Sequence, residues 1–347
     1  MTLKELTRPN IWALEPYTCA RDEFKGDASA WLDANENSVI TGLNRYPDPL
    51  QWEVKKQLSA VVSVAPENIF LGVGSDECID LCYRVFCRPG IDNVVAIDPT
   101  YGMYGVCAGI NDVEYRRVAL NDDFSLDSDA LLAATDANTK VIWICSPNNP
   151  TANAFPLQQL REIASRFGGI TVIDEAYADF STHGTMAGFL SEFPRMIIMR
   201  TFSKAWAAAA MRLGIAFAST DIINLFNKVK YPYNINLLTQ RQALQVLADK
   251  DHIRQVAAQI VEIRNNLAPK LENLPLVEKV YPSDANFLLV KIKNADATGV
   301  YRYLCSRGVV VRNRSRVKLC DNCLRVTVGN ETENKLLLNC LNEYNVD

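Results

Sequence analysis

The middle of the chain alternates short apolar segments with longer amphipathic ones. The short segments are rich in valine and isoleucine and are apolar at nearly every position, which is typical of strands buried on both faces. Between two of them, residues 156–167 repeat leucine, isoleucine and alanine at helical spacing. Alternating strands and helices predict a mostly parallel α/β sheet. The expected strands are 69–73, 93–97, 141–145, 170–173, 196–199 and 214–218.

The pattern changes after about residue 220. Residues 240–271 are mostly helical in their spacing, and a terminal helix is expected over 332–341. Helices with a few short strands predict a second, smaller α+β domain. The short strands are expected at 286–291, 308–311 and 324–328. We therefore expect an N-terminal arm with part of the small domain over 1–40, a large domain over 41–240 and a small domain over 241–347.

Polar clusters rich in glycine and proline follow the predicted strands of the large domain. The carboxyl ends of parallel strands meet at one edge of a sheet, and ligands bind there. The sequence therefore predicts one active site that is built from several separate segments. These segments are 74–77, 99–101, 146–150, 174–177 and 201–204.

Lys204 is the first candidate for chemistry. It follows a predicted strand and precedes the alanine-rich segment 205–211, which is expected to be helical. The positive end of a helix dipole would help the amine to lose its proton, and a neutral amine can attack an aldehyde. Ser203 could donate to a phosphate and Arg212 could add positive charge. A solvated surface lysine is the more usual state of a single lysine.

Two charged residues stand in or at the end of apolar strands. Asp174 ends one of them, where a carboxylate needs a cationic partner, although it could instead cap the next helix. Tyr177 could reach the same ligand. Arg325 lies inside another apolar strand and should bind an anion. The alternating basic residues from 312 to 318 are typical of a solvated strand edge.

The remaining candidates lie in loops and at a helix start. Gly74 and Ser75 precede a helical segment, where backbone N–H groups can hold a phosphate. Glu77 stands where a dinucleotide-binding fingerprint needs glycine, which argues against that fold. Asn149 lies between two prolines in a rigid loop that could aim its amide at a ligand or be a simple turn. Tyr101 could stack on an aromatic ligand or belong to the core.

Composition narrows the class of protein. A hydrophobic content of 48% supports a large core, and a net charge of −4 argues against nucleic acid or an anionic membrane as partner. No apolar stretch approaches the roughly 18 residues of a membrane helix. Ten scattered cysteines are typical of a cytoplasmic protein with free thiols. With only two histidines and one CxxC at 320–323, we expect neither a metal site nor a histidine-based nucleophile.

In this order the motifs resemble the fold-type I aminotransferases that depend on pyridoxal phosphate (PLP), and more narrowly the histidinol-phosphate aminotransferases. The resemblance covers nearly the whole chain. It implies a large domain with a mostly parallel seven-stranded sheet flanked by helices, plus a smaller α+β domain. The stretches that carry it are 32–37, 45–49, 74–77, 99–104, 145–151 and 324–329.

The resemblance also implies a role for each matching residue. Lys204 would attach the cofactor covalently, and Asp174 would lie at the ring nitrogen. Tyr177 and Asn149 would bind the phenolic oxygen, and Tyr101 would stack on the ring face. The residues implied to surround the cofactor phosphate are Ser75, Asp76, Ser203 and Arg212. Lys204, Asp174 and Tyr177 would be the catalytic residues. Tyr46 is implied to reach the phosphate of the neighbouring subunit's cofactor, which makes a homodimer the working unit. The substrate anion is implied to bind Arg325 and Arg312, with Tyr17 and Asn35 nearby.

The implied reaction is a step of histidine biosynthesis in the cytoplasm. L-Histidinol phosphate and 2-oxoglutarate would give imidazole-acetol phosphate and L-glutamate. An aromatic-amino-acid aminotransferase and a threonine-phosphate decarboxylase of the same fold stay open, whereas a PLP-binding regulator would need a further DNA-binding domain. The chain departs from the family at Ala152 and in the alanine run 207–210, where glycine is usual. If position 152 requires a positive φ, Ala152 is strained.

Overall fold

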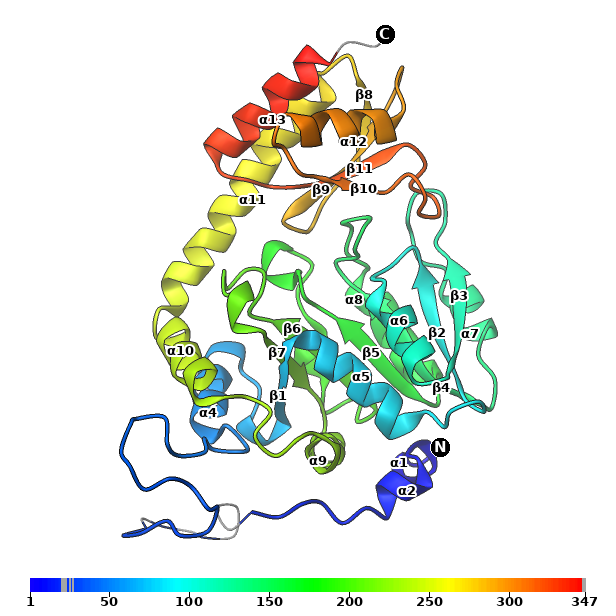
Figure 1. Cartoon of the computed structure of the whole chain (residues 1–347). Coiled ribbons are helices and arrows are strands. Elements are labelled where there is room, and N and C mark those ends of the chain that lie inside the picture. The colour runs from blue at the N-terminus through cyan, green and yellow to red at the C-terminus, as the bar shows by residue number, and fades with distance from the viewer. Residues whose placement is uncertain (20–23, 25, 27, 345–347) are drawn as a thin grey trace.

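A seven-stranded sheet forms the centre of the larger part of the molecule (Figure 1). The computed structural model describes the whole chain except residues 20–23, 25, 27 and 345–347. Neighbouring strands are parallel except at β7, which runs antiparallel to both β1 and β6. The order across the sheet is β1-β7-β6-β5-β4-β2-β3. The strands are β1 Ile69–Val73, β2 Asn93–Asp98, β3 Glu114–Ala119, β4 Thr139–Cys145, β5 Ile170–Asp174, β6 Met196–Thr201 and β7 Leu213–Phe217.

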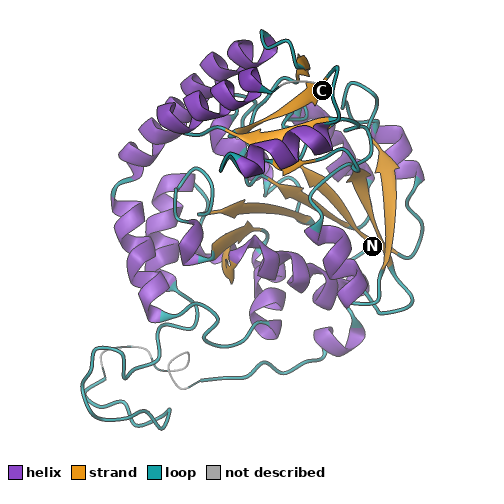
Figure 2. Ribbon diagram, turned by 45° about the horizontal axis from the view of Figure 1, so that its top comes forward, coloured by secondary structure: helices purple, strands orange, loops and turns teal. Residues whose placement is uncertain are grey.

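Helices cover both faces of this sheet (Figure 2). On one face, α5, α6 and α9 contribute Ile79, Tyr104 and Phe226 to a buried core. On the other face, α4 and α8 contribute Leu58 and Leu160 to a second core, together with residues of α7 and α10. The large domain is therefore a three-layer α/β/α structure. Its helices are α4 Trp52–Val62, α5 Gly74–Phe86, α6 Met103–Ile110, α7 Ser128–Ala133, α8 Leu157–Arg166, α9 Thr220–Val229 and α10 Leu237–Ala248.

A separate four-stranded antiparallel sheet forms the smaller part, at the top of Figure 1. Its strands pair in the order β10-β11-β9-β8 and pack against α11, α12 and α13 through their own core. The long helix α11 runs from the large domain to this sheet. The elements are α11 Lys250–Glu272, β8 Val277–Val280, β9 Phe287–Ile292, α12 Ala297–Ser306, β10 Arg312–Asn313, β11 Cys323–Thr327 and α13 Glu331–Glu343.

The chain begins with two short helices, α1 Leu3–Leu6 and α2 Pro9–Trp12. Leu6 and Ile11 are buried in the core of the large domain on the side of α9. From there to α4 the described residues run along the bottom of Figure 1 without regular structure. The domain boundaries expected near residues 40 and 240 stay a prediction.

The six strands expected for the large sheet are confirmed, as is the seven-stranded architecture. The strand expected at 308–311 is wrong, because pairing with β11 begins only at Arg312. The amides of Gly308 and Val309 instead donate to the carbonyls of Cys305 and Leu304 at the end of α12. They are therefore not available to a sheet.

The helix expected over 205–211 is also wrong. After Lys204 the chain forms turns and only a short 3-10 helix, Ala209–Met211. Ala207 has a φ of 50°, and the amide of Ala208 donates to the carbonyl of Phe202. The segment closes the connection between the adjacent antiparallel strands β6 and β7, and this tertiary requirement outweighs the helix propensity of alanine. A helix dipole at Lys204 is thus not available.

Candidate active site

The five polar segments that follow strands of the large sheet meet at one cavity. It has a volume of about 750 Å³ and lies between the carboxyl edge of the large sheet and the strands β10 and β11 of the small domain. The convergence predicted from the sequence is therefore confirmed. Residues of these segments that line the cavity are Ser75, Asp76, Thr100, Tyr101, Asn149, Pro150, Asp174, Ala176, Tyr177, Thr201, Ser203 and Lys204.

Asp174 is the buried acid at the end of β5. Its side chain accepts hydrogen bonds from the Tyr104 hydroxyl at 2.6 Å and from the Ala176 amide at 3.1 Å. Burial raises the pKa of Asp174, and none of the described lysines or arginines lies within ion-pair distance of it. The 3-10 helix that follows, Ala178–Phe180, has Tyr177 and not Asp174 at its N-cap position. A buried carboxylate that forms no ion pair with any described lysine or arginine suits a positively charged ligand atom.

Lys204 lines the same cavity as this acid. Its Nζ is 5.5 Å from the centroid of the Tyr177 ring. Burial, followed by the positive charge of Arg325, lowers the pKa of Lys204. A larger fraction of the amine is therefore neutral and nucleophilic than on an open surface. The cause is burial and neighbouring cations, not the helix dipole expected from the sequence.

The loop after β4 places Asn149 between two other site residues. Its Nδ2 is 3.5 Å from the Tyr177 hydroxyl, and its Oδ1 accepts from Arg325 Nη1. Asn148 holds the loop through its side-chain amide, which donates to the Pro99 carbonyl at 2.9 Å. Ala152 has a φ of 71°, so this position does require the left-handed backbone at which alanine is strained.

The start of α5 and the loop before β7 form a cradle for an anion. Gly74 has a φ of +69°, and its amide donates to the Arg212 carbonyl at 2.7 Å. The Arg212 guanidinium lies 3.4 Å from Asp76 Oδ2. A Cβ on Gly214 would come within 2.1 Å of Gly74, so only glycine allows β7 to approach the helix start. The amides of the first helical turn, Ser203 and Arg212 together fit a phosphate.

The small domain contributes arginines to the opposite wall of the cavity. Arg312 and Arg325 are directly paired in the register of β10 and β11, and both line the cavity. The Arg325 guanidinium also lies over the Phe287 ring at 5.2 Å. Arg314 lines the same wall, although the sequence had indicated only a solvated edge there. Its convergence with Arg325 depends on strand pairing, which the alternating pattern alone does not reveal.

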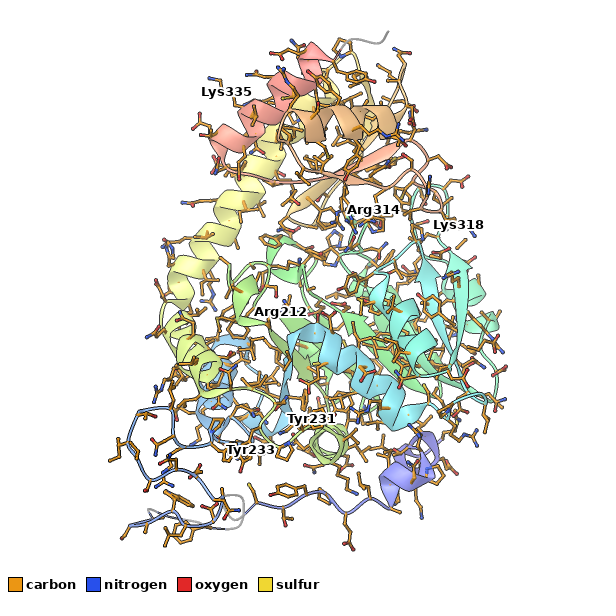
Figure 3. The ribbon with its side chains drawn as sticks, in the orientation of Figure 1. Arg212, Tyr231, Tyr233, Arg314, Lys318 and Lys335 are labelled. Carbon is orange, nitrogen blue, oxygen red and sulfur yellow. The ribbon has the colours of Figure 1, made fainter. Side chains whose placement is uncertain are left out.

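Three residues that the resemblance placed at the site lie outside the cavity of the single chain. Tyr17 is 74% exposed. Asn35 and Tyr46 line a separate hollow of about 610 Å³, where Tyr46 stacks on Tyr233 with a centroid distance of 4.4 Å. Figure 3 shows Tyr233 at the N-terminal arm and far from Arg314, which lies between the small sheet and the large domain.

Tyr104 is a residue of the site for which the sequence predicts no role. It lies in a resembling stretch, but only the folded chain shows that its hydroxyl donates to Asp174. Its ring stacks on Trp143 at 4.8 Å, which fixes the hydroxyl in place. A tyrosine on a helix after a β-strand gives no sequence signal for this contact.

Within the part of the chain that the structure describes, no helix is both long and apolar enough to cross a bilayer. Over the same residues, no group of three or more histidine, cysteine, aspartate or glutamate side chains is arranged to hold a metal ion.

Comparisons with known proteins agree with this geometry. Residues 19–341 match the family model described as aminotransferase class I and II. A histidinol-phosphate aminotransferase of Bacteroides fragilis is 52% identical over 344 residues, which are 99% of each chain. That of Cytophaga hutchinsonii is 48% identical over 99% of each chain.

A solved structure gives the same fold. The histidinol-phosphate aminotransferase from Sinorhizobium meliloti, in complex with pyridoxal 5′-phosphate, superimposes with a TM-score of 0.80 at 24% identity, covering 87% of this chain and 83% of that one. At this identity the likeness concerns the fold. The full-length relatives carry the assignment: the chain is an aminotransferase of the class I and II family and belongs, within it, to the histidinol-phosphate aminotransferases.

Proposed function

We propose that this enzyme uses PLP attached to Lys204 to transfer the amino group of L-histidinol phosphate to 2-oxoglutarate. The products would be imidazole-acetol phosphate and L-glutamate. The observation that carries the proposal is that a buried acid, an amine with a lowered pKa and an arginine wall face one cavity. The names of the full-length relatives favour this substrate over phenylalanine or threonine phosphate.

The residues present fit PLP. Asp174 is buried and forms no ion pair with a described lysine or arginine, and it would accept a hydrogen bond from the protonated pyridine nitrogen. The start of α5 with Ser75, Asp76, Ser203 and Arg212 would hold the phosphate. Asn149 and Tyr177 would bond the phenolic oxygen, and Tyr101 would stack on the ring. When bound, PLP supplies an electron sink and carries the amino group between the two half-reactions.

Lys204 would then act twice. It would hold the cofactor covalently in the resting enzyme. Once released, its Nζ would accept a proton from the substrate and donate it again later in the reaction. Because burial lowers the pKa of Lys204, its amine can accept that proton near neutral pH. Tyr177 and Asp174 orient the ring throughout.

The arginine wall would bind the anionic end of both substrates. Histidinol phosphate carries a phosphate ester and no carboxylate, whereas glutamate presents a carboxylate at the same place. Arg325 lies in β11 and is held by Asn149, so it suits the contact that both substrates share. Arg312 is exposed on the edge strand β10 and would add charge for the phosphate.

We also propose that the working unit is a homodimer with shared sites. Tyr46 would reach the cofactor phosphate of the partner subunit, with Tyr17 and Asn35 near the partner's substrate. Several large apolar side chains are exposed along the arm, which supports burial against a second copy. Among the described residues these are Leu32, Val39, Ile40 and Leu43. In this arrangement residues 41–240 bind the cofactor and 241–347 bind the substrate anion. Residues 1–40, together with Tyr46, complete the neighbouring site.

The test is to add amines separately to the purified enzyme and to follow the cofactor spectrum in a single turnover. L-Histidinol phosphate should convert the cofactor to its amine form, and 2-oxoglutarate should restore it. A kcat/KM for phenylalanine far above that for histidinol phosphate would instead identify an aromatic aminotransferase. Release of carbon dioxide from threonine phosphate would identify a decarboxylase.

A further inference from the structure

Three arginines stand on one face of the ribbon formed by β10 and β11. Arg312 is paired with Arg325 in the strand register. The amide of Arg314 donates to the Cys323 carbonyl at 2.9 Å, so the antiparallel ladder continues one residue pair beyond β10. Residues two apart on a strand point to the same face. Arg314 therefore joins the other two, and all three line the cavity that contains Lys204.

This cationic group has no acidic partner within the described residues. None of the three guanidinium groups forms an ion pair with a described carboxylate. Arg325 donates to an amide oxygen, that of Asn149. The Nε of Arg314 is buried and has no hydrogen-bond partner. A half-buried arginine with an unsatisfied donor beside other arginines is costly, and a bound anion would relieve this cost.

The three charges interact with each other. Burial, followed by the charges of Arg325 and Arg312, lowers the pKa of Arg314 to about 10. The guanidinium is still protonated at neutral pH. Burial and the charge of Arg312 also lower the pKa of Arg325. An anion that touches all three groups therefore removes repulsion as well as forming its own bonds.

The number of guanidinium groups exceeds what one carboxylate needs. A single arginine can bind a carboxylate through two parallel hydrogen bonds, and Arg325 suffices for that. A phosphate monoester offers three terminal oxygens and a charge approaching −2 at neutral pH. We infer that Arg314 is a specificity-determining residue, which binds a phosphate dianion together with Arg312 and Arg325 and contributes little to a carboxylate. The inference that Arg314 selects a phosphate rests on the proposed function in one respect only, namely that the phosphate ester is histidinol phosphate.

The test uses small anions as competitors of the L-glutamate half-reaction in the PLP-loaded enzyme. Inorganic phosphate stands in for the ester and acetate for a carboxylate. In Arg314→Gln the inhibition constant of phosphate should rise about 10- to 100-fold, as expected for a lost charge-assisted bond. The inhibition constant of acetate should change less than about threefold. Arg314→Lys keeps the charge without the planar fork and should lose only part of the phosphate affinity.

Arg316→Gln is the matched control. Arg316 belongs to the same basic segment but is exposed and does not line the cavity, so its loss should leave both inhibition constants unchanged. An equal loss of phosphate and acetate binding in Arg314→Gln would overturn the inference, and so would unchanged phosphate inhibition. Should wild type fail to react with histidinol phosphate while phosphate still competes through Arg314, the proposed substrate fails and the selection of a dianion stands.

Discussion

Replacing Asp174 with asparagine removes one charge from the floor of the cavity and little else. The amide keeps the shape of the side chain, which is 3% exposed. It can still accept a hydrogen bond from Tyr104, as the carboxylate does at 2.6 Å. It cannot stabilise a protonated pyridine nitrogen. We therefore expect Asp174→Asn to bind PLP through Lys204 and to lose most of its turnover.

The size of this loss follows from the surroundings of Asp174. No described lysine or arginine forms an ion pair with it, so the ring nitrogen would be its sole cationic partner. Breaking a buried charge pair by removing one member costs about 3–5 kcal/mol. If the Asp174 charge stabilises mainly the transition state, in which electrons move into the ring, this cost lowers the rate about 100- to 5,000-fold.

The assay is the single-turnover rate of the L-glutamate half-reaction, with cofactor content measured by absorbance. Asp179→Asn is the matched control, because Asp179 pairs with Arg200 at 3.3 Å and does not line the cavity. It should keep the wild-type rate. Turnover of Asp174→Asn within a few fold of wild type would refute the role of this carboxylate at the ring nitrogen.

Three further predictions concern the same site. The hydrogen bond from the Tyr104 hydroxyl keeps the pKa of Asp174 lower than burial alone would. Tyr104→Phe should therefore raise this pKa and move the acid limb of the kcat profile to higher pH, by about one unit. A pH–rate profile checks this, and an unmoved acid limb contradicts it. Arg325→Ala should slow both half-reactions, whereas Arg312→Ala should slow mainly that of histidinol phosphate; equal harm to glutamate from Arg312→Ala refutes the division. Inactive homodimers of Tyr46→Phe and of Lys204→Ala should recover activity when they exchange subunits, because each mixed dimer then contains one intact site. No recovery after verified exchange means that each site lies within one chain.

Much of the large domain could be predicted because its strands are buried on both faces. Residues 141–145 and 170–173 are continuous apolar segments, and such segments leave few alternatives. β3 was missed because it is an edge strand whose residues 114–119 include a glutamate and two arginines. β8 was missed for a similar reason, since only its first residue is fully buried.

The error after Lys204 has a different origin. Alanine favours helices in isolation, by less than 1 kcal/mol per residue over most other residues. The pairing of β6 with β7 requires a connection that turns back within residues 202–212. A left-handed backbone at Ala207 and Arg212 meets this requirement. Sequence propensity carries no information about such a partner strand.

The candidate site shows the same limit. Residues at strand ends, such as Asp174, could be found because their position in the pattern is unusual. Tyr104 and Arg314 could not, because their importance comes from contacts across the fold. Tyr46 lies outside the cavity of the single chain, so its role needs a second subunit and stays a prediction.

The attachment of the cofactor to Lys204 is the central claim, and borohydride tests it most directly. Reduction of the purified, PLP-loaded enzyme should fix the cofactor irreversibly, and mass spectrometry of the digested protein should recover the adduct on the peptide that contains Lys204. Lys204→Ala should give no adduct. Recovery of the adduct on another lysine in wild type, for instance the buried Lys55 with its pKa lowered to about 8, would contradict the account.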